Sequence, residues 1–333
     1  MKPFGLGFVG CGGYANSLAN AAAKSDKLAM VACWDISEKN AAALADKHGI
    51  RQCSTLEELL SLPDVDGVVI ASPNHAHREN ALAAASAGKH IFVDKPIANT
   101  MQDAWAMVDA ASQAGVVLAV GHNTRRSPGH RKMKEMIDSG AVGTPITIEA
   151  NFSHSGGLGL KPDQWRSSRE YCPALPLMQL GVHFADTVQY LLGDVFEVAS
   201  FMSHLVIPVD NVDTTVSVLK FQSGPLGYLG SNYATPSVFY VNVYGTGGNL
   251  YCEGGGQLLY KKAGTNEREP IPLQPADTQV EQLEEFAACA QNGGKPEVDG
   301  IAAVKALAIV LAALKSDAEK RPVRTAEVIG RQL

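Results

Sequence analysis

A glycine-rich segment near the start of the chain has the composition and spacing of a phosphate-binding turn. The run Gly10-Cys11-Gly12-Gly13-Tyr14-Ala15 matches the pattern G-x-G-x-x-A. One glycine allows a tight turn, a second lets the backbone approach a pyrophosphate, and the small last residue lets a helix pack close to a strand. The N–H groups at the start of that helix favour an anion. We therefore expect this segment to bind a dinucleotide.

Asp35 ends the next apolar run, at the distance from the glycines that is typical of dinucleotide-binding proteins. A carboxylate at this position can accept hydrogen bonds from both ribose hydroxyls. It would repel a 2′-phosphate by about 2–4 kcal/mol at a near-surface dielectric. No arginine follows at once, and Lys39 is the nearby cation that leaves NADP(H) as the second choice. The sequence therefore favours NAD(H).

Two polar segments each follow an apolar run that is expected to be a strand. They are Ser72-Pro73-Asn74 and Asp94-Lys95. Ligands of open α/β sheets bind beyond the carboxyl ends of the strands. We therefore expect both segments, together with His77, to lie beside the cofactor. Lys95 is either a solvated lysine in a turn or a group that hydrogen-bonds a substrate hydroxyl and lowers its pKa.

A later helix carries a polar stripe. Gln179, His183, Asp186 and Tyr190 are spaced i, i+4, i+7 and i+11, so they share one helix face. A titratable histidine at the start of such a stripe can act as a general acid or base. The alternative is a structural histidine on a half-buried helix.

The elements that must position the first group of residues alternate strictly between strands and helices, which predicts a parallel, doubly wound sheet. The expected strands are 6–9, 29–34, 65–71, 90–93 and 116–120, and the expected helices are 14–24, 38–48, 55–60, 77–87 and 101–114.

After Gly121 the pattern changes to long alternating runs, which are typical of a largely antiparallel sheet. We expect a dinucleotide-binding domain over 1–122 and an α+β domain over 123–333, with terminal helices that can pack on either. The expected strands are 146–152, 197–205, 214–221, 227–232, 238–244, 249–253 and 257–261, and the expected helices are 130–137, 177–192, 277–291 and 300–316.

Composition excludes several classes of protein. The 333 residues carry a formal net charge of −6 with scattered cations, so neither nucleic acid nor a membrane surface is an expected partner. No run of 18 apolar residues predicts a membrane span. The six cysteines contain no C-x-x-C, and the His75-x-His77 pair has no third ligand nearby, so no metal site is expected. Buried thiols in a reducing compartment, the cytoplasm, are the expectation.

Taken together, three motifs resemble those of the Gfo/Idh/MocA oxidoreductases, a family that includes glucose–fructose oxidoreductase, inositol dehydrogenases and sugar 3-dehydrogenases. They are G-C-G-G-Y-A, the D-K-P at Asp94 (usually E-K-P) and the G-x-H-x-x-D of the helix at His183. The runs N-T-R-R from Asn123 and D-Q-W-R from Asp163 also match, and the resemblance covers nearly the whole chain.

The resemblance implies a Rossmann domain and a second domain with a large open sheet, with the active site between them. It implies hydride transfer between the nicotinamide and a secondary hydroxyl or ketone of a sugar, glycoside or cyclic polyol. Lys95 matches the catalytic lysine and His183 the acid/base histidine, and the open sheet implies a homodimer or homotetramer. The residues expected to contact substrate are Asn123, Arg125, His154, Trp165, Arg166, Gln179 and Asp186.

The chain departs from the family pattern at two positions. Asp94 replaces a glutamate, which is a minor change. Gln179 stands where many members carry an aspartate that orients the histidine and stabilises its cation, so His183 is expected to be less basic. Two alternatives follow: a dihydrodiol dehydrogenase of the same family, or a non-catalytic NAD(H)-binding regulatory protein, which Gln179 would favour.

Overall fold

The computed structural model describes residues 2–332, and the chain divides into two compact units. The first consists of Met1–His122 and Asp277–Val304, and the second of Asn123–Ala276 and Lys305–Leu333. The sequence placed a single boundary near residue 122. In the structure the chain also returns: Asp277–Val304, for which the sequence allowed packing on either domain, lies within the first unit.

The first unit is built on a six-stranded parallel sheet in the order β3-β2-β1-β4-β5-β6, the strand order of dinucleotide-binding folds. The alternating elements predicted the parallel, doubly wound sheet. Its strands are β1 (Phe4–Val9), β2 (Leu28–Trp34), β3 (Arg51–Gln52), β4 (Gly67–Ile70), β5 (His90–Val93) and β6 (Leu118–Val120). Its helices are α1 (Gly13–Ala22), α2 (Glu38–His48), α3 (Leu56–Ser61), α4 (His77–Ser86), α5 (Met101–Ala114) and α8 (Thr278–Asn292), with a short turn η1 (Asn74–Ala76).

Local chemistry sets the ends of these helices. The side chains of Ser37, Thr55 and Thr100 accept hydrogen bonds from backbone N–H groups in the first turns of α2, α3 and α5. Gly49 and Gly115 end α2 and α5 in the left-handed conformation, which glycine adopts without strain. The strands between them are buried along most of their length, as expected for a sheet covered on both faces.

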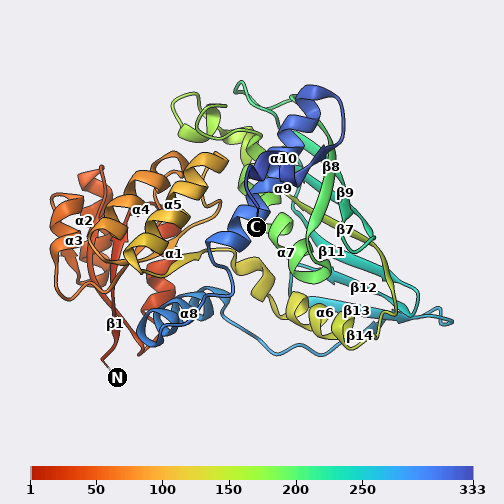
Figure 1. Cartoon of the computed structure of the whole chain (residues 1–333), viewed down its shortest axis with the longest axis horizontal. Helices are drawn as coiled ribbons and strands as arrows, with labels where there is room; N and C mark the ends of the chain where they lie inside the picture. Colours follow the sequence, from red (N-terminus) through yellow and green to blue (C-terminus); the bar gives the residue numbers. More distant parts are fainter. Residues whose placement is uncertain (1, 333) are drawn as a thin grey trace. The chain divides into compact units, whose positions relative to one another are not determined.

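Helix α8 belongs to the first unit because an aromatic cluster attaches it to the sheet. The Phe286 ring lies 5.5 Å from Phe4 of β1 in an edge-to-face contact and 5.9 Å from Phe92 of β5. All three rings are buried. Figure 1 shows α8, in blue, beside α1 and β1, in red, from the opposite end of the sequence.

The second unit is built on a nine-stranded sheet in the order β14-β13-β12-β11-β7-β10-β9-β8-β15. Its ladders are antiparallel except for the parallel pair β7 and β10. The strands are β7 (Pro145–Ser153), β8 (Val195–Ser203), β9 (Thr214–Phe221), β10 (Leu226–Asn232), β11 (Val238–Gly245), β12 (Gly248–Glu253), β13 (Gln257–Lys262), β14 (Glu269–Pro270) and β15 (Val323–Arg324). The helical elements are η2 (Asn123–Arg126), α6 (Pro128–Asp138), η3 (Ser155–Gly159), η4 (Trp165–Ser167), η5 (Leu177–Gly181), α7 (Val182–Leu192) and α10 (Thr325–Ile329), while α9 (Gly300–Glu319) runs from the first unit into the second.

One face of the large sheet is covered and the other is open. Along β9 the side chains of Thr215, Ser217 and Leu219 are buried, while Val216 and Val218 are exposed. In Figure 1 the helices α6 and α7 of this unit lie on one side of the sheet, and α7 packs against β7. The strict alternation of the strand residues is the reason that one face alone joins the core.

Two local features differ from the sequence expectations. The segment Leu177–Gly181 forms a π-helix before α7 begins, where an α-helix from 177 was expected. The two-residue strands β3, β14 and β15 were not expected, because runs so short show no periodicity.

In residues 2–332, no helix has both the length and the apolar character that crossing a membrane requires.

Candidate functional site

The glycine loop after β1 takes a conformation that only glycine suits. Gly10 has φ = +85°, and a Cβ built there would lie 2.6 Å from the backbone nitrogen of Ser72. The loop after β1 therefore lies directly against the loop after β4, and a larger residue at position 10 would push them apart.

Two further glycines leave open space where a phosphate group fits. A Cβ built on Gly12 or Gly13 meets no heavy atom within 4 Å. Helix α1 begins at Gly13, has no side-chain cap at Gly12 and has no acidic residue in its first turn. Its first N–H groups are thus available to an anion. The cradle that these residues form fits the pyrophosphate of a dinucleotide.

Asp35 joins the glycine loop to the end of β2. Its Oδ2 accepts a hydrogen bond from the backbone N–H of Cys11 at 2.6 Å, and its Oδ1 accepts one from the N–H of Ser37 at 2.7 Å. Each carboxylate oxygen has two lone-pair directions, so each can still accept a ribose hydroxyl. Asp35 is therefore positioned to fix the loop and to bind a sugar at once.

The side chains of Cys11 and Tyr14 point into the protein. The pKa of the Cys11 thiol is raised by its hydrogen bond with the Cys33 thiol and by burial. The pKa of the Tyr14 hydroxyl is raised by burial and by the nearby charge of Asp94. Both groups therefore stay neutral, and the thiol and the hydroxyl are both buried in the protein.

His77 joins the loops after β4 and β5. The ring is fully buried, with Nε2 3.0 Å from the Ser72 carbonyl oxygen and Nδ1 3.0 Å from that of Pro96. Burial, with a further contribution from the charge of Lys95, lowers its pKa to about 4, so the ring is neutral at pH 7. The sequence placed His77 at the cofactor, and the contacts described here are with the backbone that carries the neighbouring residues.

The other predicted residues at this edge surround His77. Asn74 is buried and its Nδ2 donates to Asn99 Oδ1 at 3.2 Å, which fixes the turn after Pro73. Asp94 and Lys95 directly follow the buried residue Val93 at the end of β5, and both are half-buried. The carboxyl edge of the parallel sheet thus gathers the glycine loop, Asp35, Ser72, Asn74, Asp94 and Lys95.

In the second unit, His183 lies at the start of α7 and its ring is held by Thr124. A hydrogen bond of 3.0 Å joins His183 Nδ1 to Thr124 Oγ1. The Phe152 ring of β7 lies 5.7 Å from the imidazole. His183 is half-buried, and its Nδ1 is held by the Thr124 hydroxyl. Thr124 was not predicted, because 59 residues separate it from the histidine and no local pattern marks it.

The next residue, Arg125, forms a buried ion pair with Asp186, one turn after His183. Arg125 Nε donates to Asp186 Oδ2 at 2.8 Å, and Nη2 donates to Oδ1. The Asp186 side chain is 0% exposed and that of Arg125 is 9% exposed. The guanidinium carbon of Arg125 lies 5.2 Å from the centroid of the Tyr190 ring, and the Tyr190 hydroxyl oxygen accepts a hydrogen bond from Arg131 Nη1. The predicted polar stripe is thus attached to η2, and these two residues, expected at the substrate, bind each other.

A second cluster contains Gln179, Arg166, Trp165 and His154. Arg166 Nε donates to Gln179 Oε1 at 3.1 Å, and its guanidinium stacks over the Trp165 ring at 4.4 Å. Gln179 Nε2 donates to Cys172 Sγ at 3.4 Å. His154 is half-buried and its Nδ1 accepts the N–H of Gly156 at 2.9 Å. Burial lowers the pKa of His154, so it is a neutral ring that carries its proton on Nε2.

His130 is a buried residue of the second unit that the sequence did not single out for function. Its Nδ1 lies 2.8 Å from the carbonyl oxygen of Thr124, and burial lowers its pKa to about 4. The ring stacks on Phe239 and meets Phe184 edge-on. His130 therefore holds the backbone of the residue whose side chain holds His183. Asn123, the remaining predicted residue, begins η2 and is half-buried.

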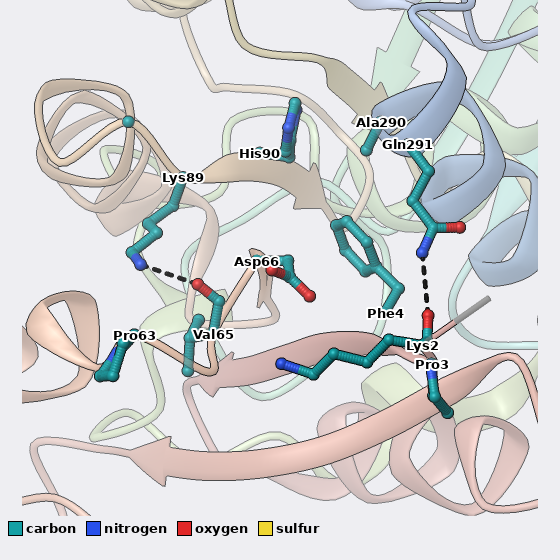
Figure 2. Close-up of a pocket in the computed structure, with 11 residues that line it drawn as sticks. Lys2, Pro3, Phe4, Pro63, Val65, Asp66, Lys89, His90, Ala290 and Gln291 are labelled. Atoms are coloured by element: carbon teal, nitrogen blue, oxygen red, sulfur yellow. Dashed lines mark hydrogen bonds between the residues drawn. The ribbon is translucent and has the colours of Figure 1, made fainter.

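A hollow of about 530 Å³ lies elsewhere in the first unit (Figure 2). Phe4 and His90, which begin β1 and β5, line it, so it lies at the amino edge of the sheet, opposite the glycine loop. Its Lys89 Nζ binds the Leu62 and Val65 carbonyl oxygens, and Gln291 Nε2 binds that of Lys2. These polar groups therefore form hydrogen bonds with the protein's own backbone.

In residues 2–332 no group of three or more His, Cys, Asp or Glu side chains is arranged to hold a metal ion.

The strand order and the glycine cradle define the first unit as a dinucleotide-binding Rossmann fold. Residues 4–122 match the family of oxidoreductases with an NAD-binding Rossmann fold known as Gfo/Idh/MocA. Residues 130–251 match the C-terminal domain of the same family. The chain belongs to the Gfo/Idh/MocA oxidoreductase family, as its motifs suggest.

Relatives with full-length similarity have been named. A protein of Ensifer adhaerens named 1,5-anhydro-D-fructose reductase is 32% identical over 94% of this chain and 96% of its own length. Myo-inositol 2-dehydrogenase of Thermotoga maritima is 27% identical over 98% and 99% of the two chains. A solved structure from Desulfitobacterium hafniense, provisionally assigned as an NADPH-dependent oxidoreductase, is 36% identical, with a TM-score of 0.96 over 99% of this chain and 100% of that one.

Proposed function

We propose that the protein is an NAD(H)-dependent dehydrogenase that acts on a secondary hydroxyl or ketone of a sugar, glycoside or cyclic polyol. The observation that carries the proposal is the open glycine cradle at α1 together with Asp35, in a chain of this oxidoreductase family. The relatives named as a reductase of an anhydro-sugar and a dehydrogenase of inositol support the substrate class.

The cofactor, when bound, supplies the acceptor or donor of the hydride. In the oxidising direction, the Lys95 ammonium group hydrogen-bonds the substrate hydroxyl oxygen and lowers its pKa. His183 accepts the hydroxyl proton at Nε2. For that role its Nδ1 must carry the other proton and donate to Thr124 Oγ1, which the 3.0 Å contact allows. Gln179 carries no negative charge that would stabilise the protonated form of His183. The protonated histidine can therefore also donate its proton to a ketone oxygen, which is the step that the reducing direction needs.

Cofactor preference is the finer part of the proposal. We assign Asp35, which accepts hydrogen bonds from the Cys11 and Ser37 N–H groups, to the ribose of the cofactor, where its negative charge disfavours a 2′-phosphate. Because one similar structure is provisionally assigned to NADPH, the two cofactors must be compared directly. We expect NADH to bind more tightly than NADPH.

A substrate panel followed at the absorbance band of NADH tests the function. We expect turnover of at least one sugar, polyol or their ketones with NAD(H), and loss of that turnover in Lys95→Ala and His183→Ala. A Lys95→Ala variant with full activity would remove the role given to Lys95. Turnover of aromatic dihydrodiols instead of sugars would indicate the dihydrodiol dehydrogenases of the family.

A regulatory protein that binds NAD(H) without turning over a substrate is the second candidate. Gln179 favours it, because the neutral amide cannot stabilise a charged His183. NADH binding in the absence of turnover across the whole panel would support this candidate.

The assembly proposed is a homodimer or homotetramer formed through the open face of the large sheet. Phe201, Val218 and Leu226 on this face are 73%, 51% and 51% exposed, and Phe201 pairs with exposed Val216 across β8 and β9. Light scattering in solution measures the mass, and a monomer would contradict this assembly.

The location proposed is a reducing compartment, the cytoplasm. The six free, buried cysteines support it, and fractionation of the source cells tests it.

A further inference from the structure

Arg166 is an exposed cation of the second unit. Among residues 2–332 no carboxylate forms an ion pair with Arg166, whereas Arg125 and Arg169 in the same unit pair with Asp186 and Asp210. Its described polar partner is the neutral amide of Gln179. The side chain is exposed, so this charge faces the region where a ligand can reach it.

The guanidinium of Arg166 is nevertheless held in place. Its plane stacks over Trp165 at 4.4 Å, and its Nε is used by Gln179. Gln179 is fixed in turn, because its Nε2 donates to Cys172 Sγ and so directs Oε1 at the arginine. With Nε occupied, the two Nη groups at the end of the side chain form the fork that matches the two oxygens of an oxyanion.

The positive charge of Arg166 lies near the proposed acid/base residue. Gln179 precedes His183 by four residues in the continuous helical segment formed by η5 and α7. From the other side, the Tyr233 ring packs on His154 at 4.7 Å between ring centroids. Burial raises the pKa of Tyr233, and the nearby charge of Arg166 opposes that rise. His154 and His183 both contact Phe152, at 6.2 and 5.7 Å. Arg166 and His183 are thus connected through Gln179 on one side and through Tyr233, His154 and Phe152 on the other.

The neutral side chain of Gln179 leaves the charge of Arg166 available to an anionic ligand. A carboxylate in the place of the Gln179 amide would pair with Arg166 and cancel its charge. The amide orients the guanidinium by one hydrogen bond and leaves its charge intact. Glutamine in place of aspartate at position 179 therefore has two effects. It removes a negative charge that would stabilise the His183 cation, and it leaves Arg166 as an oriented cation in the second unit.

We propose that Arg166 binds an oxyanion on the substrate, so that the sugar or polyol carries a carboxylate or phosphate group. This inference rests on the proposed function for the identity of the ligand as a sugar. It adds that acidic members of the class bind better than neutral ones, by roughly 10- to 100-fold, the range expected for hydrogen bonds to a charged group.

Matched hexoses test the inference. D-glucose, D-glucuronate and D-glucose 6-phosphate are titrated against the full-length protein with NADH present, and binding is followed by the rise in melting temperature. We expect half-maximal stabilisation by glucuronate, glucose 6-phosphate or both at a concentration at least tenfold lower than for glucose. Selectivity for one of the two acids identifies the carboxylate or the phosphate.

Three variants assign the effect to the arginine. Arg166→Gln should remove the preference for the acidic hexoses, and Gln179→Glu should reduce it by pairing the guanidinium internally. Arg169→Gln, in the same loop region but paired with Asp210, is the control and should retain the preference. Equal binding of the three hexoses, binding of none, or a preference that survives Arg166→Gln would overturn the inference.

The proposed dehydrogenase function is tested separately, by measuring NAD(H)-linked turnover. Turnover of neutral sugars without any preference for acidic ones would keep the dehydrogenase and remove the anion site. Arginine-dependent binding of an acidic hexose, with no turnover of any member of the panel, would keep the anion site and remove the dehydrogenase.

Discussion

Breaking the buried pair between Arg125 and Asp186 should destabilise the second unit. In Arg125→Met the carboxyl group of Asp186, which is 0% exposed, would lose its ion-pair partner and the two hydrogen bonds that Arg125 donates. Removing one partner of a buried pair costs about 3–5 kcal/mol. For a unit of this size each kcal/mol lowers the melting temperature by roughly 2–4 °C, so we expect a loss of about 6–20 °C.

Thermal unfolding followed by circular dichroism measures this loss. The double variant Arg125→Met, Asp186→Leu removes both charges and should recover most of the stability, because apolar residues of similar size replace many buried pairs without cost. Arg169→Gln breaks an exposed pair, with side chains 56% and 89% exposed, and should cost under about 1 kcal/mol.

The competing hypothesis, taken from the family resemblance, is that Arg125 and Asp186 bind substrate. It predicts that Arg125→Met raises KM with little change in melting temperature. A loss of less than about 2 °C in the single variant, or no recovery in the double variant, would refute the structural role that the burial and the geometry indicate.

Three further predictions concern single residues. Asp35→Asn removes the charge near the ribose and should reduce the preference for NADH over NADPH by about 30- to 1,000-fold, the equivalent of 2–4 kcal/mol, in fluorescence titrations; an unchanged preference would exclude Asp35 as its source. Thr124→Val should lower kcat/KM by about tenfold and shift the pH–rate profile, while Thr124→Ser keeps the hydroxyl and the rate; equal profiles for the two variants would show that His183 needs no partner at Nδ1. His130 has a pKa of about 4 in the folded protein against an ordinary 6.5, so the unfolded chain takes up the proton first, and the free energy of unfolding should fall as the pH drops from about 6.5 to 4. The contribution of His130 to this pH dependence is up to about 3 kcal/mol. His130→Asn keeps a donor for the Thr124 carbonyl and should flatten the slope of unfolding free energy against pH, measured in urea titrations. A variant with the wild-type slope would contradict the burial of a neutral ring.

The fold of the first unit could be read from the sequence because its signals are local. Alternating apolar and amphipathic runs predict the parallel sheet, and the glycine pattern predicts the turn after β1. The strand β3, Arg51–Gln52, is too short to show any periodicity, so the sixth strand was not predicted. The place of α8 was left open, because helix patterning shows which face is apolar but not which sheet it covers.

The site was predicted less completely because its contacts join distant parts of the chain. The stripe from Gln179 to Tyr190 was visible on one helix face, but its partners Thr124, Arg125 and Arg166 are brought there by the fold. No spacing rule links Thr124 to His183 across 59 residues. The π-helix at Leu177–Gly181 also differs from the expected α-helix, since its extra residue per turn leaves no mark in the amphipathic pattern.

The contact of Phe286 with Phe4 and Phe92 has a consequence for recombining this chain with its relatives. The nucleotide-binding unit is assembled from two stretches of chain, 1–122 and 277–304, so its aromatic core closes only after residue 286 has been synthesised. A chimera made by grafting residues 1–122 alone would leave the rings of Phe4 and Phe92 without their third member. An exchange that transfers the unit intact needs two inserted segments, 1–122 and 277–304, with the second spliced within the continuous helix α9.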